Sequence, residues 1–474
     1  MPRTDPDIPL STLLQLALIP YRGLWDPGRD GLGDEVLQGA IVDGLAALPD
    51  LNRRWRLAWG PSRYDPRFTL FDDHLMFAAQ DRTKPFRFVF VVRATNPRSL
   101  LDWLLGDPWI GRTVRWQGEM CPGSSARHTD GRVSLSAALG FVILRNMRSH
   151  PLPEDPLTRL WRRIEDGAGE RVRRTARWMA TRIRGKGGRG LRTLQAPLRE
   201  DVRNLDPSSA RRREEAAQAY LEWLASGLAA GRRPIFPRFV DRCSRFGVTG
   251  PFDLLSFLEG NAHLRHRVDP GLGSLAFLQE VLEKRGKVEV VVTGHGKGGT
   301  LALLFALWLT ETRTSDSGSG NGGWDRDGQS RIRCITFAAP PAGDAAFARH
   351  AERMLGGDLI QVAGERDIVP NAWTPGGLES ILECFPGYPL PPGLESVVRE
   401  LSPVLDRVGY TPIPSAAVRV PGHLTSQVRS FYQQALYQHL EAYLEDARVG
   451  ADAPVRLFLD RRHRVERSAE NARV

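Results

Sequence analysis

The sequence predicts an α/β fold with a mostly parallel sheet flanked by helices. At its centre lies a valine-rich run at 288–292, which is short enough for a buried strand. A glycine-dense turn follows, and an apolar helix is predicted from Thr300. Further strands are expected at 86–92, 333–338 and 359–363. Helical patterns alternate with these strands, as is typical of parallel strands joined by right-handed crossovers.

The helical patterns are apolar or amphipathic at a spacing of three to four residues. They lie at 36–48, 133–147, 342–354 and 426–446, with a further helix from Leu272 into the central strand. The segment 385–421 is rich in proline and is predicted to be irregular.

The 474 residues carry a formal net charge of +10, and the charge is concentrated. Residues 151–240 hold 20 Lys/Arg against 11 Asp/Glu, a net of +9. We therefore predict that the α/β domain is built from 1–150 and 246–446. A basic helical insertion at 151–245 separates its two parts, and a charged tail follows at 447–474.

The insertion contains nine Lys/Arg and no acid between residues 171 and 193. Arginines surround apolar residues that recur at helical spacing: Arg173, Arg174, Arg177, Arg182 and Arg184. A solvated helical face is the default interpretation. Attachment to an anionic membrane surface comes next. Nucleic-acid binding is third, because Trp178 is the one aromatic residue in the run. The position of the insertion between core elements also permits a lid.

The N-terminus lacks the features of a cleavable signal peptide. Asp5 and Asp7 precede the apolar patch at 10–19, where a signal peptide has a positive segment. The longest apolar run, 301–309, is too short to span a membrane. We expect a location in the cytoplasm, or export without a cleavable signal peptide, and no transmembrane helix.

The central turn has the strand–turn–helix context of a nucleophile elbow, in which the motif G-x-S-x-G presents a serine at a sharp turn. Here the frame is Gly294-x-Gly296-x-Gly298, so glycine occupies the serine position. Glycine suits the positive φ that this position normally holds under strain. It has no side chain, and no acyl-enzyme can form on it. His295 is predicted to support the turn.

Several motifs in a fixed order resemble those of one enzyme family. They are Trp59-Gly60-Pro61, Arg93-Ala94-Thr95-Asn96, Asp102-Trp103-Leu104, Phe337-Ala338-Ala339-Pro340, Asp367-Ile368-Val369-Pro370 and Gln438-His439 with Tyr443-Leu444. The chain resembles the class 3 lipases, specifically the bacterial branch whose elbow has the sequence GHSKGG. This resemblance covers about residues 50–150 and 270–445. It implies an α/β-hydrolase fold and hydrolysis of lipid or acyl-ester substrates without metal or cofactor.

In such enzymes a serine attacks the ester carbonyl, a histidine takes its proton and an aspartate orients the histidine. The resemblance places the nucleophile position at Gly296 and the acid at Asp367, which follows a predicted strand. It favours His439 as the base. His423 remains the alternative, because His439 lies within a predicted helix whereas His423 lies in a loop before it.

The resemblance also places an oxyanion hole beside the elbow, formed by backbone N–H groups of Lys297 and Thr95. Ala94 replaces a glycine of the family in the second of these loops.

Two hypotheses follow for the function. The chain is a lipase or esterase whose serine has been replaced, and which is inactive as written. Alternatively, it is a natural pseudoenzyme that binds lipid or regulates a partner. The sequence predicts neither the acyl substrate nor the oligomeric state.

Overall fold

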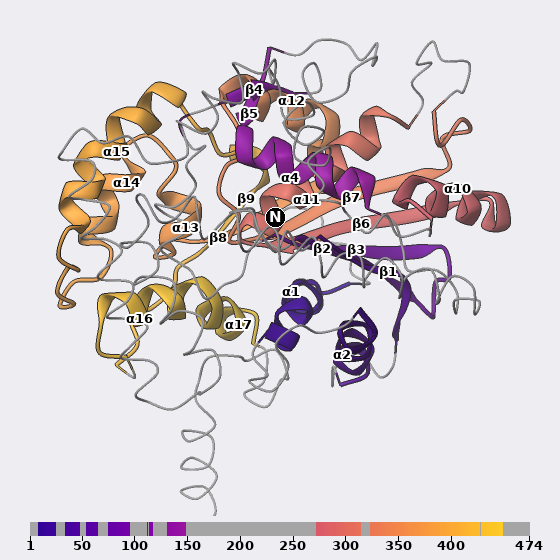
Figure 1. Ribbon diagram of the computed structural model, residues 1–474, viewed down its shortest axis with the longest axis horizontal. Coiled ribbons are helices and arrows are strands. Elements are labelled where there is room, and N and C mark those ends of the chain that lie inside the picture. The colour runs from indigo at the N-terminus through magenta and orange to yellow at the C-terminus, as the bar shows by residue number, and fades with distance from the viewer. Residues whose placement is uncertain are drawn as a thin grey trace, which may run out of the picture.

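The architecture is that of a computed structural model, which contains a seven-stranded mixed sheet covered on both faces by helices (Figure 1). The structure describes residues 8–24, 34–47, 54–64, 74–94, 111, 113–116, 130–147, 272–313, 323–426 and 428–448. The predicted fold class, a mostly parallel sheet flanked by helices, is confirmed.

The sheet has the strand order β1-β2-β3-β6-β7-β8-β9. The strands are β1 (Trp55–Tyr64), β2 (His74–Asp81), β3 (Arg87–Arg93), β6 (Val288–His295), β7 (Ser330–Phe337), β8 (Leu359–Gly364) and β9 (Ala417–Val420). The pairs β1–β2 and β2–β3 are antiparallel, and all neighbouring pairs from β3 to β9 are parallel. A small second sheet pairs β4 (Thr113–Arg115) with β5 (Arg132–Ser134).

Two hydrophobic cores lie on opposite faces of the sheet, because successive side chains along β2 and β3 alternate between them. One face packs against α4 (Leu135–Asn146), α10 (Ser274–Arg285), α11 (Lys297–Glu311) and α12 (Ala345–Leu355). The other packs against α1 (Leu10–Leu18), α2 (Asp34–Ala46) and the region around α17 (Ala442–Asp446). Figure 1 shows the helices of these two groups above and below the strands.

A third, smaller core joins the helices beyond the carboxyl ends of β8 and β9. They are α13 (Ile368–Asn371), α14 (Gly377–Ser380), α15 (Leu394–Val408) and α16 (Phe431–Leu436). The prediction that 385–421 is irregular is therefore wrong. Although it contains Pro403, α15 forms because its strongly amphipathic sequence buries Val397 and Leu405.

The predicted long helix at 426–446 is also wrong in detail. It is interrupted by a turn of π-helix at Tyr437–Glu441 between α16 and α17. The helix predicted at 133–147 begins two residues later than predicted, at Leu135. Ser134 ends β5, and its side chain caps α4 by accepting a hydrogen bond from Ala137 N.

The basic insertion at 151–245, including all five arginines named above, lies outside the described residues. So do Thr95, Asp102-Trp103-Leu104 and the tail from 449. Within the described part of the chain, no helix is long and apolar enough to cross a membrane.

Candidate active site

The elbow connects β6 to α11 through Gly296, which has φ 57° and ψ −132°. Its N–H donates to the carbonyl oxygen of Phe337 at 2.9 Å, and its own carbonyl accepts from Gly299 N at 2.8 Å. A positive φ is reached by glycine without steric cost, whereas a residue with a side chain holds it under strain. The backbone therefore has the form of a nucleophile elbow although residue 296 has no nucleophile.

The two flanking glycines are required by close packing rather than by their own dihedral angles. A Cβ added at Gly294 would clash with the carbonyl of Gly298 and lie 2.8 Å from the Val92 carbonyl oxygen. A Cβ added at Gly298 would clash with the same Val92 oxygen. The elbow can therefore sit against β3 only when both positions are glycine.

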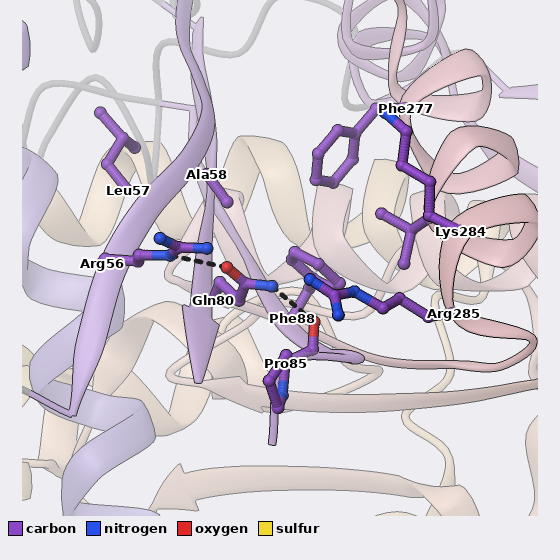
Figure 2. Close-up of a pocket in the computed structure, with 10 residues that line it drawn as sticks. Arg56, Leu57, Ala58, Gln80, Pro85, Phe88, Phe277, Lys284 and Arg285 are labelled. Atoms are coloured by element: carbon purple, nitrogen blue, oxygen red, sulfur yellow. Dashed lines mark hydrogen bonds between the residues drawn. The ribbon is translucent and has the colours of Figure 1, made fainter. Parts of the chain in front are cut away.

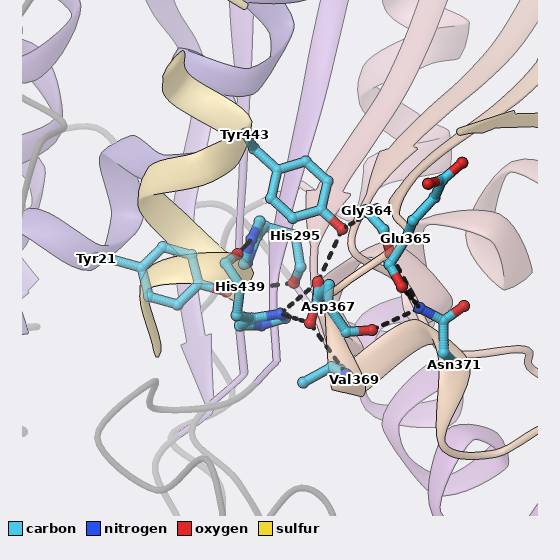
Figure 3. Close-up of polar contacts among 9 residues, drawn as sticks. All are labelled: Tyr21, His295, Gly364, Glu365, Asp367, Val369, Asn371, His439 and Tyr443. Atoms are coloured by element: carbon cyan, nitrogen blue, oxygen red, sulfur yellow. Dashed lines mark hydrogen bonds and ion pairs between the residues drawn. The ribbon is translucent and has the colours of Figure 1, made fainter. Parts of the chain in front are cut away.

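Asp367 lies between β8 and α13, at the carboxyl edge of the sheet, and is fully buried. Its Oδ1 accepts from Val369 N at 3.0 Å, so the carboxylate caps α13. Its Oδ2 accepts from the Tyr443 hydroxyl at 2.8 Å and from His439 Nδ1 at 2.9 Å. Figure 3 shows these groups converging on the carboxylate.

His439 is fully buried in the turn of π-helix and is brought to Asp367 from the C-terminal segment. Because the carboxylate can only accept, Nδ1 carries the proton of this hydrogen bond. The remaining nitrogen, Nε2, is then the basic one. A π-turn widens the helix locally and is common at functional sites.

His423, the alternative base, is held elsewhere. Its side chain is 57% exposed, and its Nε2 lies 2.7 Å from the Tyr437 hydroxyl and 3.2 Å from a carboxylate oxygen of Glu445. The structure thus brings together Asp367 and His439, whereas His423 is bound to a different acid.

His295 connects the elbow to the π-turn. Its Nε2 lies 2.8 Å from the His439 carbonyl oxygen and donates to it, and the two rings lie 4.5 Å apart. Burial, with the nearby His439 adding to it, holds the pKa of His295 well below its ordinary value. His295 is therefore a neutral, buried group that links the elbow to the segment of His439.

Tyr443 was not given a role by the sequence, although it is part of the lipase-like motif. Its hydroxyl accepts from Gly364 N at 2.7 Å and donates to Asp367. Burial and the Asp367 charge raise the pKa of Tyr443 well above its ordinary value, so it remains a donor. The signal that could have identified it is its place in the lipase-like motif, four residues after His439.

The predicted oxyanion groups are described only in part. Lys297 is the first residue of α11, where backbone N–H groups point out of the helix end. Thr95 lies outside the described residues, and its neighbour Ala94 is fully buried. Thr300, the nearest hydroxyl in α11, donates to the Pro340 carbonyl oxygen at 2.8 Å and is thus used in packing.

The mostly parallel sheet, the elbow after its central strand and the buried Asp367 after a later strand are features of the α/β-hydrolase fold. Residues 273–376 match the sequence profile of the family "Lipase (class 3)". The resemblance of the chain to the class 3 lipase family is thereby confirmed.

Two known proteins illustrate this similarity. The lipase-like PAD4 of Arabidopsis thaliana is 34% identical over 92 residues, which cover 19% of this chain and 15% of that relative's own length. The crystal structure of M37 lipase matches with a TM-score of 0.58 and 20% identity, over 93% of this chain and 94% of that one. At this identity the structural match supports the fold alone.

Proposed function

We propose that this chain is a lipase-like protein built for acyl-ester hydrolysis, and that it is inactive as written because Gly296 replaces the nucleophile. One observation carries the proposal. A buried Asp367–His439 pair, with Nδ1 of the histidine bound to the carboxylate, belongs to the same edge of the sheet as an elbow with positive φ at residue 296. This pairing is the orienting half of a serine-hydrolase triad.

The expected division of roles follows from hydrogen-bond chemistry. In the parent reaction a serine hydroxyl at 296 loses its proton to His439 Nε2 while its oxygen attacks the ester carbonyl. Asp367 holds the imidazole in the required tautomer and stabilises the imidazolium that forms. The N–H groups of Lys297 and Thr95 are proposed to bind the oxyanion. His439 then returns the proton to the leaving alkoxide, and water hydrolyses the acyl-enzyme by the same steps.

The experiment is to restore the hydroxyl with Gly296→Ser and to measure hydrolysis of short acyl esters and labelling by a fluorophosphonate. Loss of the nucleophile costs about 10⁶-fold in a serine hydrolase of another fold, so activity should rise by several orders of magnitude. Gly296→Ala is the matched control, because it introduces a comparable backbone strain of about 1–3 kcal/mol without a nucleophile.

Second substitutions in the restored protein assign the remaining roles. Asp367→Asn should lower turnover by about 10⁴-fold, because the wrong tautomer of the histidine is favoured. His439→Ala should abolish it, whereas His423→Ala should change it little, since His423 is exposed and bound to Glu445. A large loss with His423→Ala and none with His439→Ala would reverse the assignment.

The second candidate is a natural pseudoenzyme that binds lipid or regulates a partner, and Gly296 itself favours it. A restored serine that folds but neither hydrolyses esters nor reacts with the fluorophosphonate would support this candidate over a disabled enzyme.

The basic insertion is proposed, from its sequence, to attach the protein to anionic membranes. Replacing the five arginines with glutamine should weaken binding to vesicles that contain phosphatidylserine, by about 1 kcal/mol for each charge near the surface. Added salt should weaken binding of the unchanged protein as well. Vesicle binding that responds to neither change would leave a solvated helical face as the interpretation.

A further inference from the structure

A hollow of about 310 Å³ opens on the α10 side of the sheet, away from the elbow. It is lined by the first residues of β1, the end of β2, the start of β3 and one side of α10. Phe88 on its floor pairs with Val290, whereas Val92 pairs with Gly294 of the elbow. The two sites are therefore separated by four residues, about 13 Å, along β3.

Two guanidinium groups enter this hollow from opposite sides. Arg56 comes from β1 and Arg285 from the end of α10, and in Figure 2 both point toward Gln80. Arg56 is oriented by a hydrogen bond from its Nε to Gln80 Oε1 at 2.7 Å, and Gln80 is held in turn by the Pro85 carbonyl. A neutral amide, rather than an acid, thus separates two like charges.

No carboxylate occurs among the described residues that line the hollow. Lys284, the third cation, is already paired with Glu280 at 2.9 Å. Among the residues that the structure describes, neither arginine has an acidic partner, so an anion from solution can bind between them. A planar anion with two oxygens matches guanidinium geometry best.

The rest of the lining is apolar. Phe277 stands edge-on to Phe88 with ring centroids 5.2 Å apart, and Leu57, Ala58 and Val281 extend the surface. The volume lies at the lower end of the range of small-molecule sites, about 300–1,000 Å³. It suits a single alkyl chain better than a two-chain lipid.

From this combination we propose that the hollow binds a single-chain anionic amphiphile, namely a fatty-acid carboxylate. Its head is bound between Arg56 and Arg285, and its chain lies against Phe277 and Val281. The binding is non-covalent and does not depend on the chemistry of residue 296. The site would allow the protein to bind a fatty acid apart from its acyl-ester site.

The test is calorimetric titration of the unchanged protein with decanoate below its micellar concentration. Butyrate provides the head without the chain, and decyl glucoside provides a chain with a neutral head. Decanoate should bind at least tenfold more tightly than either, since burial of several methylenes and the anionic head both contribute.

Variants distinguish this hollow from an acyl site near the elbow. The double change Arg56→Gln and Arg285→Gln should weaken decanoate binding about tenfold, and Val281→Glu should weaken it further by adding a like charge. Arg353→Gln with Arg399→Gln is the matched control, because both arginines are exposed and lie on other helices. Equal affinity in the Arg56/Arg285 variant and the control, or equal binding of decyl glucoside, would overturn the proposal.

Discussion

Removal of the Tyr443 hydroxyl is the most direct test of how the Asp367 site is held. Tyr443→Phe preserves the ring, which packs against the edge of His295, and removes one oxygen. That oxygen makes two buried hydrogen bonds, one to the Asp367 carboxylate and one from Gly364 N. The substitution therefore removes a hydrogen-bond donor from the Asp367 carboxylate and the hydrogen-bond acceptor of the Gly364 N–H.

The magnitude follows from these two losses. A hydrogen bond to a charged group contributes about 1.5–3 kcal/mol, and a buried N–H left without an acceptor costs about 1–3 kcal/mol. The two terms share one site and are not fully additive. We expect the free energy of unfolding to fall by about 2–4 kcal/mol, without a change in the denaturant slope.

Urea unfolding of the chain as given measures this loss, because no catalytic activity is required. Tyr388→Phe is the matched control, since the Tyr388 hydroxyl donates to the Thr425 carbonyl oxygen at 2.7 Å and touches no charge. The control should lose about 0.5–1.5 kcal/mol. A loss in Tyr443→Phe no larger than the control would refute the view that the hydroxyl holds the buried carboxylate.

Two further predictions concern the elbow. The pKa of His295 is lowered in the folded state. Below about pH 6.5, His295 is therefore protonated in the unfolded chain but stays neutral in the folded chain. The free energy of unfolding is therefore not reduced by His295 above pH 6.5, and it falls as the pH is lowered further, by up to about 1.4 kcal/mol per pH unit. Between pH 7.5 and 5.5, the free energy of unfolding measured with urea should fall less in His295→Gln than in the unchanged protein. An equal fall in both proteins would contradict a buried, neutral His295. Gly298→Ala should lower the free energy of unfolding by about 1–3 kcal/mol, because its methyl would clash with the Val92 carbonyl. Gly39→Ala in α2 is the matched control, because neither helical glycine has a positive φ and a Cβ at Gly39 meets nothing within 4 Å.

Four of the seven strands of the large sheet (β3, β6, β7 and β8) and most of its helices could be predicted from periodicity, whereas β1, β2 and β9 were not predicted. The valine run becomes β6, and the apolar stretch after it becomes α11, which begins three residues earlier than predicted, at Lys297. Local patterns suffice there because both elements are buried almost completely. The helix α15 was not predicted, because the prolines of the segment 385–421 favour irregular structure. Tertiary packing of the amphipathic face of α15 outweighs the one hydrogen bond that Pro403 removes.

The site shows the same division between local and tertiary information. Asp367 is predicted as a site residue from its motif and from its place directly after a strand, both of which are local features of the sequence. The resemblance favours His439, but the sequence leaves His423 open as the alternative, because the choice depends on which histidine the last segment brings to the carboxylate. The π-turn at Tyr437–Glu441 places His439 there, and such a turn has no helical spacing to reveal it.

The contacts that shape the elbow do not require a side chain at residue 296. They are backbone hydrogen bonds and the close approach of two glycines to β3. Asp367 needs only one oxygen to cap α13, and its other oxygen is used by His439 and Tyr443. A buried charged group is a costly way to gain stability, and an apolar replacement of such a pair is often neutral or better. The chain therefore keeps a buried Asp367–His439 pair that is costly in stability, beside an elbow that lacks a hydroxyl. We propose that this combination favours a lipase-like protein whose nucleophile was replaced over a binding protein with a remodelled site, and Gly296→Ser distinguishes the two.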